Sequence, residues 1–188
     1  EKLGAKIRYN TYIGRDVSFK ELRDQHDAVF IGVGAQKAST MRVAGEDSPG
    51  VLSGIAFLAE VSRDESTKIG RRVMVVGGGN TAIDAARTSA RLGAEEVSIL
   101  YRRTRKEMPA WEAEIHEAEV EGINLDILAA PTKVTPRDDG ALDVTCIRME
   151  LGEPDASGRR RPVPIEGSEY VVVVDNVIAA IGQRVDDE

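Results

Sequence analysis

Short apolar runs alternate with helical patterns through the middle of the chain, and this order predicts an α/β protein. One β-branched run ends at Val76, and a second covers residues 97–100. Residues 81–92 between them carry small apolar side chains at helical spacing, suited to lying flat on a sheet. A further helix is expected over residues 110–121, opened by Pro109, and a strand over residues 123–128.

The remaining elements surround this unit. Apolar patterns predict strands at residues 6–13 and 28–33, a helix at 18–24 and an amphipathic helix at 51–61. Ser18 and Glu21 have the spacing of a capping box. Three strands at 133–137, 142–151 and 163–174 predict an antiparallel meander, and a short strand is expected at 177–181. The predicted fold is a Rossmann-like domain, with a parallel sheet flanked by helices plus the antiparallel β-meander.

Composition limits the possible partners and compartments. The chain has 188 residues, of which 41% are hydrophobic and 30% charged, as expected of a globular protein. A net charge of -7 argues against a nucleic-acid partner. The sequence shows no apolar run long enough for a membrane span and no signal peptide, so we expect a cytoplasmic protein. Cys146 is the one cysteine, which excludes an intrachain disulfide and any zinc or iron–sulfur site built from this chain alone. We expect it to be a small packed residue, and we expect no metal site.

The strongest local motif is a glycine-rich turn between the run ending at Val76 and the following helix. Gly77, Gly79 and Ala82 occupy the three positions of a dinucleotide-binding fingerprint. The first glycine permits a tight turn, the second lets the backbone approach a pyrophosphate, and the alanine keeps the helix close to the sheet. Free N–H groups in the first helical turn then favour a phosphate at this point.

Basic residues follow the second strand, where an NAD-binding unit usually carries an acidic residue for the ribose hydroxyl. Arg102 and Arg103 stand there, with Arg105 close behind. Guanidinium groups suit a 2′-phosphate, so the sequence favours NADPH over NADH. The alternative interpretation is a solvated basic loop.

Two other features have competing interpretations. Gly32 and Gly34 resemble a second fingerprint, but a loop follows them, so we reject that interpretation. Trp111 stands near a predicted helix start, where it is expected to pack against the sheet or, alternatively, to lie near the nucleotide.

Five segments carry a recognisable set of motifs: residues 27–35, 75–86, 101–105, 107–110 and 175–183. The most specific part is Tyr-Arg-Arg at 101–103 followed by Glu-Met-Pro-Ala at 107–110. Together these motifs resemble the NADPH-binding region of the glutamate synthase small (beta) subunit, among the FAD-dependent pyridine-nucleotide oxidoreductases, and the resemblance covers nearly the whole chain.

The resemblance implies a domain organisation and a binding site. Residues 1–45 would be a fragment of an FAD-binding domain, 46–183 the NADPH-binding domain and 184–188 the start of the return to the FAD domain. The two connecting segments would lie at 30–36 and 178–183. In the implied site, Arg102 and Arg103 hold the 2′-phosphate with Arg105 as a weaker candidate, whereas no catalytic acid or base is expected. The pyrophosphate would be held by Gly78, Gly79, Asn80 and Thr81, and the nicotinamide side backed by Ala180, Ile181 and Gly182.

The resemblance also implies an activity for the full-length protein: hydride transfer from NADPH to FAD, then electron transfer through iron–sulfur clusters to a partner subunit. The chain alone is expected to bind NADP(H) without FAD, to be inactive, and to self-associate through unpaired strand edges near its N-terminus. The partner would be the glutamate synthase large subunit. Alternatively, the same module serves a ferredoxin-, formate- or hydrogen-linked enzyme, or it is a nucleotide-binding sensor or assembly module without electron transfer.

Overall fold

A five-stranded parallel sheet forms the centre of residues 35–188, one of two units into which the computed structural model divides; residues 1–34 form the other. The structure describes residues 2–63, 66–156 and 158–185. The sheet order is β2-β10-β3-β4-β5. Its strands are β2 (Val51–Ser53), β3 (Arg72–Val76), β4 (Glu96–Tyr101), β5 (Asn124–Ile127) and β10 (Asn176–Ala179).

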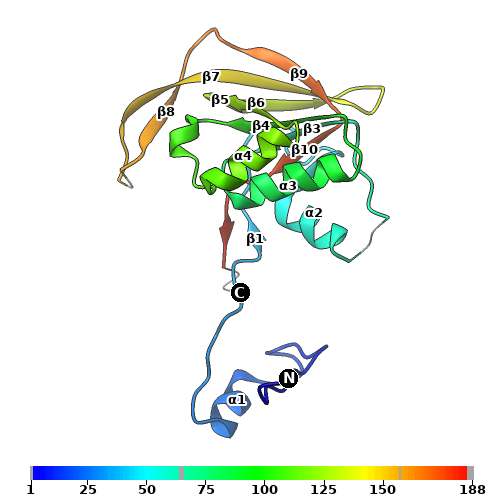
Figure 1. Ribbon diagram of the computed structural model, residues 1–188, viewed down its shortest axis with the longest axis vertical. Helices are drawn as coiled ribbons and strands as arrows, with labels where there is room; N and C mark the ends of the chain where they lie inside the picture. The colour runs from blue at the N-terminus through cyan, green and yellow to red at the C-terminus, as the bar shows by residue number, and fades with distance from the viewer. Residues whose placement is uncertain (1, 64–65, 157, 186–188) are drawn as a thin grey trace. The chain divides into compact units, whose positions relative to one another are not determined.

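Three helices cover one face of this sheet (Figure 1). They are α2 (Gly54–Val61), α3 (Asn80–Arg91) and α4 (Glu112–Val120). Helix α3 buries Ala82, Ile83, Ala85 and Ala86 completely, and these mostly small side chains allow it to approach the sheet closely. The predicted parallel α/β core is therefore confirmed.

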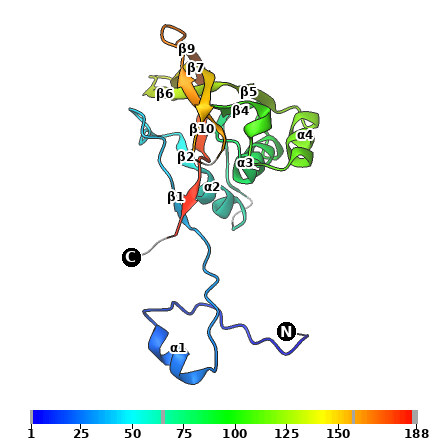
Figure 2. The ribbon, with the colours of Figure 1, turned by 90° about the vertical axis from the view of Figure 1, so that its left-hand side faces the viewer.

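Antiparallel strands cover the opposite face (Figures 1 and 2). Strand β7 (Leu142–Pro154) pairs with β6 (Ala129–Pro136) along one edge and with β8 (Arg160–Pro164) and β9 (Tyr170–Val174) along the other. The single strand predicted over 163–174 is wrong, because a turn at Glu166–Gly167 separates β8 from β9. Cys146 is fully buried in β7, as predicted.

The helix predicted over residues 51–61 is partly wrong. Residues 51–53 form β2, which pairs in parallel with Val177–Ala179 of β10, and helix α2 starts only at Gly54. The Ser53 side chain accepts a hydrogen bond from the Ala56 N–H and caps the helix. The helix predicted to start at residue 110 likewise starts at Glu112, after a short 3₁₀ helix, η1 (Arg105–Glu107).

Within the described residues 2–34 of the N-terminal unit there is one helix, α1 (Phe19–Gln25), and its capping box from Ser18 to Glu21 is confirmed. The strands predicted at 6–13 and 28–33 are wrong: neither segment forms one, and Phe30 is 94% exposed. A strand needs a neighbouring backbone to hydrogen-bond, and an apolar run does not supply one. The assignment of residues 1–45 to an FAD-binding domain stays a prediction, and the return segment 184–188 is described only to residue 185.

Two short strands connect to the parallel sheet from distant parts of the chain. Strand β1 (Lys37–Ala38) directly follows the first predicted connecting segment and pairs antiparallel with β11 (Gln183–Arg184), which begins at the last residue of the second. The described residues contain no helix directly after Gly34, so rejection of a second fingerprint there is confirmed. Within the described part of the chain, no helix is long and apolar enough to cross a membrane.

Candidate nucleotide-binding site

The predicted site residues converge where β3, β4 and β10 end. The Gly77 N–H donates to the Leu100 carbonyl over 3.1 Å, and the Ala180 N–H donates to the Val76 carbonyl over 2.8 Å. These bonds bring the glycine-rich turn, the end of β4 and the start of the Ala180–Gly182 segment to one edge of the sheet. The carboxyl edge of a parallel sheet is the usual position of a ligand site in this class of fold.

The three consecutive glycines face different constraints. A Cβ on Gly77 would lie 2.2 Å from the Ala180 carbonyl oxygen, and the φ of Gly77 is +150°, so the protein's own packing requires glycine. A Cβ on Gly78 would lie 2.5 Å from the Tyr101 ring. At Gly79 the nearest atom would be Pro109 Cγ, 3.8 Å away, so this position is open. The open position is the one at which the fingerprint expects the backbone to approach a pyrophosphate.

Helix α3 begins at this turn without a side-chain cap. Gly79 is its N-cap and provides no side-chain acceptor for the first N–H groups. The helix start is therefore a site at which an anion's oxygens can accept those N–H bonds. Ala82 follows in the first turn and is completely buried, as the fingerprint predicts.

The side chain of Asn80 is oriented by the segment that precedes α4. Its Oδ1 accepts a hydrogen bond from the Trp111 backbone N–H over 3.3 Å. A second bond, from the Ala110 N–H to the Gly78 carbonyl over 3.1 Å, ties the same segment to the glycine turn. Because Oδ1 is occupied, the Nδ2 group of Asn80 presents two donors at the start of α3.

Thr81 is linked to the opposite side of the site. The Gln183 Nε2 donates to the Thr81 hydroxyl over 3.1 Å. Since the hydroxyl oxygen accepts this bond, its proton is available to a further acceptor. Gln183 directly follows Gly182 and opens β11, so this bond joins the first turn of α3 to the predicted nicotinamide segment.

The two arginines after β4 have different environments. Arg102 is exposed, and no hydrogen bond or ion pair engages its side chain within the described residues. Arg103 is 4% exposed; its Nη2 lies 2.9 Å from the Asp155 carboxylate, and its Nε donates to the Arg160 carbonyl over 2.7 Å. Arg103 therefore joins the end of β4 to the β7–β8 hairpin, and it does not lie beside Arg102 at the surface.

Arg105, the weaker candidate, is also occupied. Its guanidinium pairs with Glu112 over 2.8 Å and with Glu119 over 2.5 Å, and these hydrogen bonds raise its pKa. The neighbouring Glu107 accepts bonds from the Thr104 hydroxyl and backbone N–H, and the hydroxyl bond is the main cause of its lowered pKa. Of the three predicted arginines, Arg102 alone has an unengaged side chain in the part of the chain that the structure describes.

Sequence reasoning missed two residues that shape the site. Tyr101 is buried against Gly78 and donates from its hydroxyl to the Glu107 carbonyl over 2.8 Å, which fixes the loop after β4. Its position directly before the arginines was the available signal. Asp155 had no local signal. The prediction that Trp111 packs against the sheet is wrong, because 72% of the residue is exposed.

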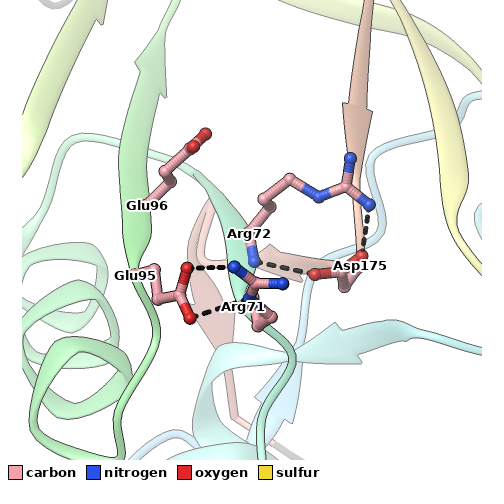
Figure 3. Close-up of a pocket in the computed structure, with 5 residues that line it drawn as sticks. All are labelled: Arg71, Arg72, Glu95, Glu96 and Asp175. Carbon is pink, nitrogen blue, oxygen red and sulfur yellow. Dashed lines mark hydrogen bonds and ion pairs between the residues drawn. The ribbon is translucent and has the colours of Figure 1, made fainter.

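A separate cavity of about 290 Å³ lies at the amino ends of β3 and β4 (Figure 3). Both of its arginines form ion pairs: Arg71 Nη2 lies 2.5 Å from a carboxylate oxygen of Glu95, and Arg72 Nη2 lies 2.5 Å from one of Asp175. Glu96 lines the cavity as well. The excess of carboxylates makes this cavity unsuitable for a phosphate, and it lies at the opposite end of the strands from the glycine turn.

Comparison with protein families identifies the chain. The model for the pyridine nucleotide-disulphide oxidoreductases matches residues 5–188. The chain belongs to this family. The recognition made from its motifs is confirmed, and the expected cofactors, NADP and FAD, agree with the family.

Curated relatives include several named oxidoreductase subunits. The chain is 50% identical to the NADPH-Fe(3+) oxidoreductase subunit beta of Geobacter sulfurreducens over 98% of its own length and 28% of the relative. It is 46% identical to the NADP(+)-dependent formate dehydrogenase subunit beta of Moorella thermoacetica, over 98% of the chain and 26% of the relative. Identity to the glutamate synthase [NADPH] small chain of Escherichia coli is 38%, over 97% of the chain and 41% of the relative. The chain thus spans less than half the length of each of these relatives.

Solved structures confirm the fold class. FprA, an oxidoreductase of Mycobacterium tuberculosis, superposes with a TM-score of 0.75 at 21% identity, over 93% of this chain and 54% of that one. Thioredoxin reductase from T. acidophilum gives a TM-score of 0.56 at 16% identity, over 79% of this chain and 42% of that one. At these identities the likeness concerns the fold alone.

Proposed function

We propose that this chain is the NADPH-binding module of an FAD-dependent oxidoreductase subunit. The observation that carries the proposal is the convergence of an open Gly79, an uncapped helix start and an unengaged Arg102 at one edge of the parallel sheet. These groups suit the two phosphate positions of NADPH. FAD bound in the full-length protein would supply the acceptor for the hydride of NADPH and the means of passing its electrons on.

The module's residues bind and orient the nucleotide. The first-turn N–H groups of α3, the Nδ2 group of Asn80 and the Thr81 hydroxyl donate to the pyrophosphate. Ala180, Ile181 and Gly182 back the nicotinamide, close to the glycine turn through the short approach of Ala180 to Gly77. No side chain acts as an acid or base, because hydride transfer between two cofactors requires only their orientation.

The 2′-phosphate is assigned to Arg102. Arg103 is in a buried ion pair and Arg105 pairs with two glutamates, so we revise the expectation that Arg103 holds the phosphate together with Arg102 and that Arg105 is a weaker candidate. In this proposal Arg103 holds the β7–β8 hairpin, and Arg105 pairs with a glutamate at each end of α4, Glu112 and Glu119. Both act on the shape and charge around Arg102 without touching the phosphate.

The identity of the electron acceptor divides the remaining alternatives. The identities of 50% and 46% to the iron- and formate-linked subunits exceed the 38% to the glutamate synthase small chain. We therefore favour an electron-input subunit of the former kind over the glutamate synthase role, with iron–sulfur clusters in other parts of the assembly. A sensor or assembly module without electron transfer is the other candidate.

Rapid mixing of the full-length protein with NADPH under anaerobic conditions tests the proposal. We expect NADPH to bleach the flavin absorbance, NADH to do so more slowly, and Arg102→Met to remove most of the difference. Lys106→Met, which changes another exposed cation in the same loop, is the matched control and should preserve the NADPH preference. A full-length protein that binds NADPH but contains no reducible flavin would support the sensor alternative instead.

A further inference from the structure

The one tryptophan of the chain is exposed beside the glycine turn. Trp111 is the N-cap of α4, and 72% of it is exposed, although its neighbour Ala110 is only 8% exposed. The backbone at this point is thus anchored while the large aromatic side chain remains in solvent. Covering an aromatic ring with another flat ring buries a large apolar area and is energetically favourable, so an exposed indole beside a ligand site is a suitable surface for stacking.

Three contacts place Trp111 and the two residues before it along the turn. The Trp111 N–H bonds Asn80, the Ala110 N–H bonds the Gly78 carbonyl, and Pro109 is the nearest neighbour of the open position at Gly79. The same segment that orients Asn80 therefore carries the indole. A single hydrogen bond, from the Trp111 N–H to Asn80, therefore links the residue that carries the indole to the groups proposed to bind the pyrophosphate.

Sheet order decides which half of the nucleotide lies on this side. Strands β10, β3 and β4 are consecutive neighbours, with Ala180 at the end of β10 and Arg102 at the end of β4. The nicotinamide half therefore extends toward β10 and the adenosine half toward β4. Trp111 lies in the connection from β4 to β5, between η1 and α4, and α4 packs beside α3, so we place Trp111 on the adenosine side.

We propose that the indole of Trp111 forms the aromatic wall of the adenine subsite and stacks on the purine ring of NADPH. This inference rests on the proposed function and adds a residue that recognises the base. Arg102 distinguishes NADPH from NADH, whereas Trp111 binds the base that both nucleotides share. The two residues therefore have separable effects, one on preference and one on affinity.

Titration of the 188-residue chain with adenosine 2′,5′-bisphosphate tests the contact directly, because this ligand does not absorb the indole emission. We expect the ligand to change the fluorescence of the one tryptophan and to protect it from acrylamide quenching, whereas nicotinamide mononucleotide does neither. Trp111→Ala should weaken NADPH and NADH binding by about three- to tenfold alike, leaving their ratio unchanged, and Trp111→Phe should restore most of the affinity.

A matched control tests whether loss of any exposed apolar side chain from α4 has the same effect. Val120, at the far end of that helix, is 73% exposed, so Val120→Ala should leave binding unchanged. Thermal melts establish that each variant is folded. If the bisphosphate binds without changing the tryptophan emission, and Trp111→Ala binds NADPH as tightly as the wild type, the stacking inference is overturned. If neither NADPH nor the bisphosphate binds the folded chain, the proposed function fails as well.

Discussion

Removal of the Arg103 guanidinium tests whether Arg103 stabilises the fold while Arg102 binds the 2′-phosphate, although both arginines were expected to hold that phosphate. Arg103→Met keeps an unbranched side chain of similar length but leaves the Asp155 carboxylate and the Arg160 carbonyl without this donor. The Arg103 side chain is 5% exposed and that of Asp155 24%, so solvent compensates the loss only partly. Arg102→Met removes the same charge from the neighbouring position, where the side chain is exposed.

The magnitude follows from the burial of the pair. Breaking a buried ion pair by removing one partner costs about 3–5 kcal/mol, and partial exposure of Asp155 reduces this to about 2–4 kcal/mol in the free energy of unfolding. For a unit of this size, each kcal/mol shifts the melting temperature by about 2–4 °C, so we expect Arg103→Met to melt about 4–16 °C lower. Arg102→Met should lie within about 0.5 kcal/mol of the wild type.

Thermal melts and nucleotide titrations of both variants measure the two roles side by side. Below its melting transition, Arg103→Met should keep the preference for NADPH over NADH within about threefold, whereas Arg102→Met should lose about 30- to 100-fold of NADPH affinity with NADH affinity unchanged. Asp155→Asn keeps the shape of the acceptor and should lose less stability than Arg103→Met. An Arg103→Met protein that melts with the wild type but loses its NADPH preference would refute this division of roles.

Three further outcomes follow from the packing and the electrostatics. Gly79→Ala should fold and melt close to the wild type, but calorimetry should show NADPH binding at least about tenfold more weakly, because the added methyl group would occupy the space in which the phosphate approaches the backbone. Gly77→Ala should fail to fold or should melt far lower. Equal stability of the two variants would contradict the account. Burial raises the pKa of the Cys146 thiol to about 12, so the native chain should not react with a thiol reagent at pH 8 until denaturant is added, and prompt labelling would contradict its burial. The hydrogen bond from Arg72 lowers the pKa of Asp175 in the folded chain. The contribution of this carboxylate to stability is therefore fully present above its unfolded pKa and is lost as the pH falls through its folded pKa, so Asp175→Asn should melt below the wild type at pH 7, and the difference in melting temperature should narrow toward pH 3. A difference that stays constant with pH would show that the charge of Asp175 is unimportant.

Local chemistry explains what the sequence could predict. The glycine turn is a contiguous motif whose steric demands act within a few residues, so the requirement for glycine at Gly77 and the burial of Ala82 agree with the structure. The alternation of apolar runs likewise identified the parallel core, since each run is buried by its immediate neighbours. The antiparallel layer was predicted as a meander, but the order of its strands around β7 was not.

Long-range partners explain what the sequence could not predict. Arg102 and Arg103 are neighbouring residues of the same type, so the local sequence does not distinguish them. The buried ion pair that does distinguish them involves Asp155, which lies 52 residues further along the chain. The apolar runs at 6–13 and 28–33 read as strands, but neither pairs with a neighbouring strand, so the exposed Phe30 segment remains without regular structure. Trp111 was misplaced because aromatic residues usually pack, whereas here the anchored backbone leaves the ring in solvent.

The central claim is that this chain binds NADPH through the glycine turn and Arg102. Calorimetric titration of the chain with NADPH and, separately, with NADH tests it most directly, repeated on Arg102→Met. We predict that NADPH binds at least about tenfold more tightly than NADH and that this preference disappears in the variant. Equal affinity of the wild type for both nucleotides, or a preference that survives Arg102→Met, would contradict the claim.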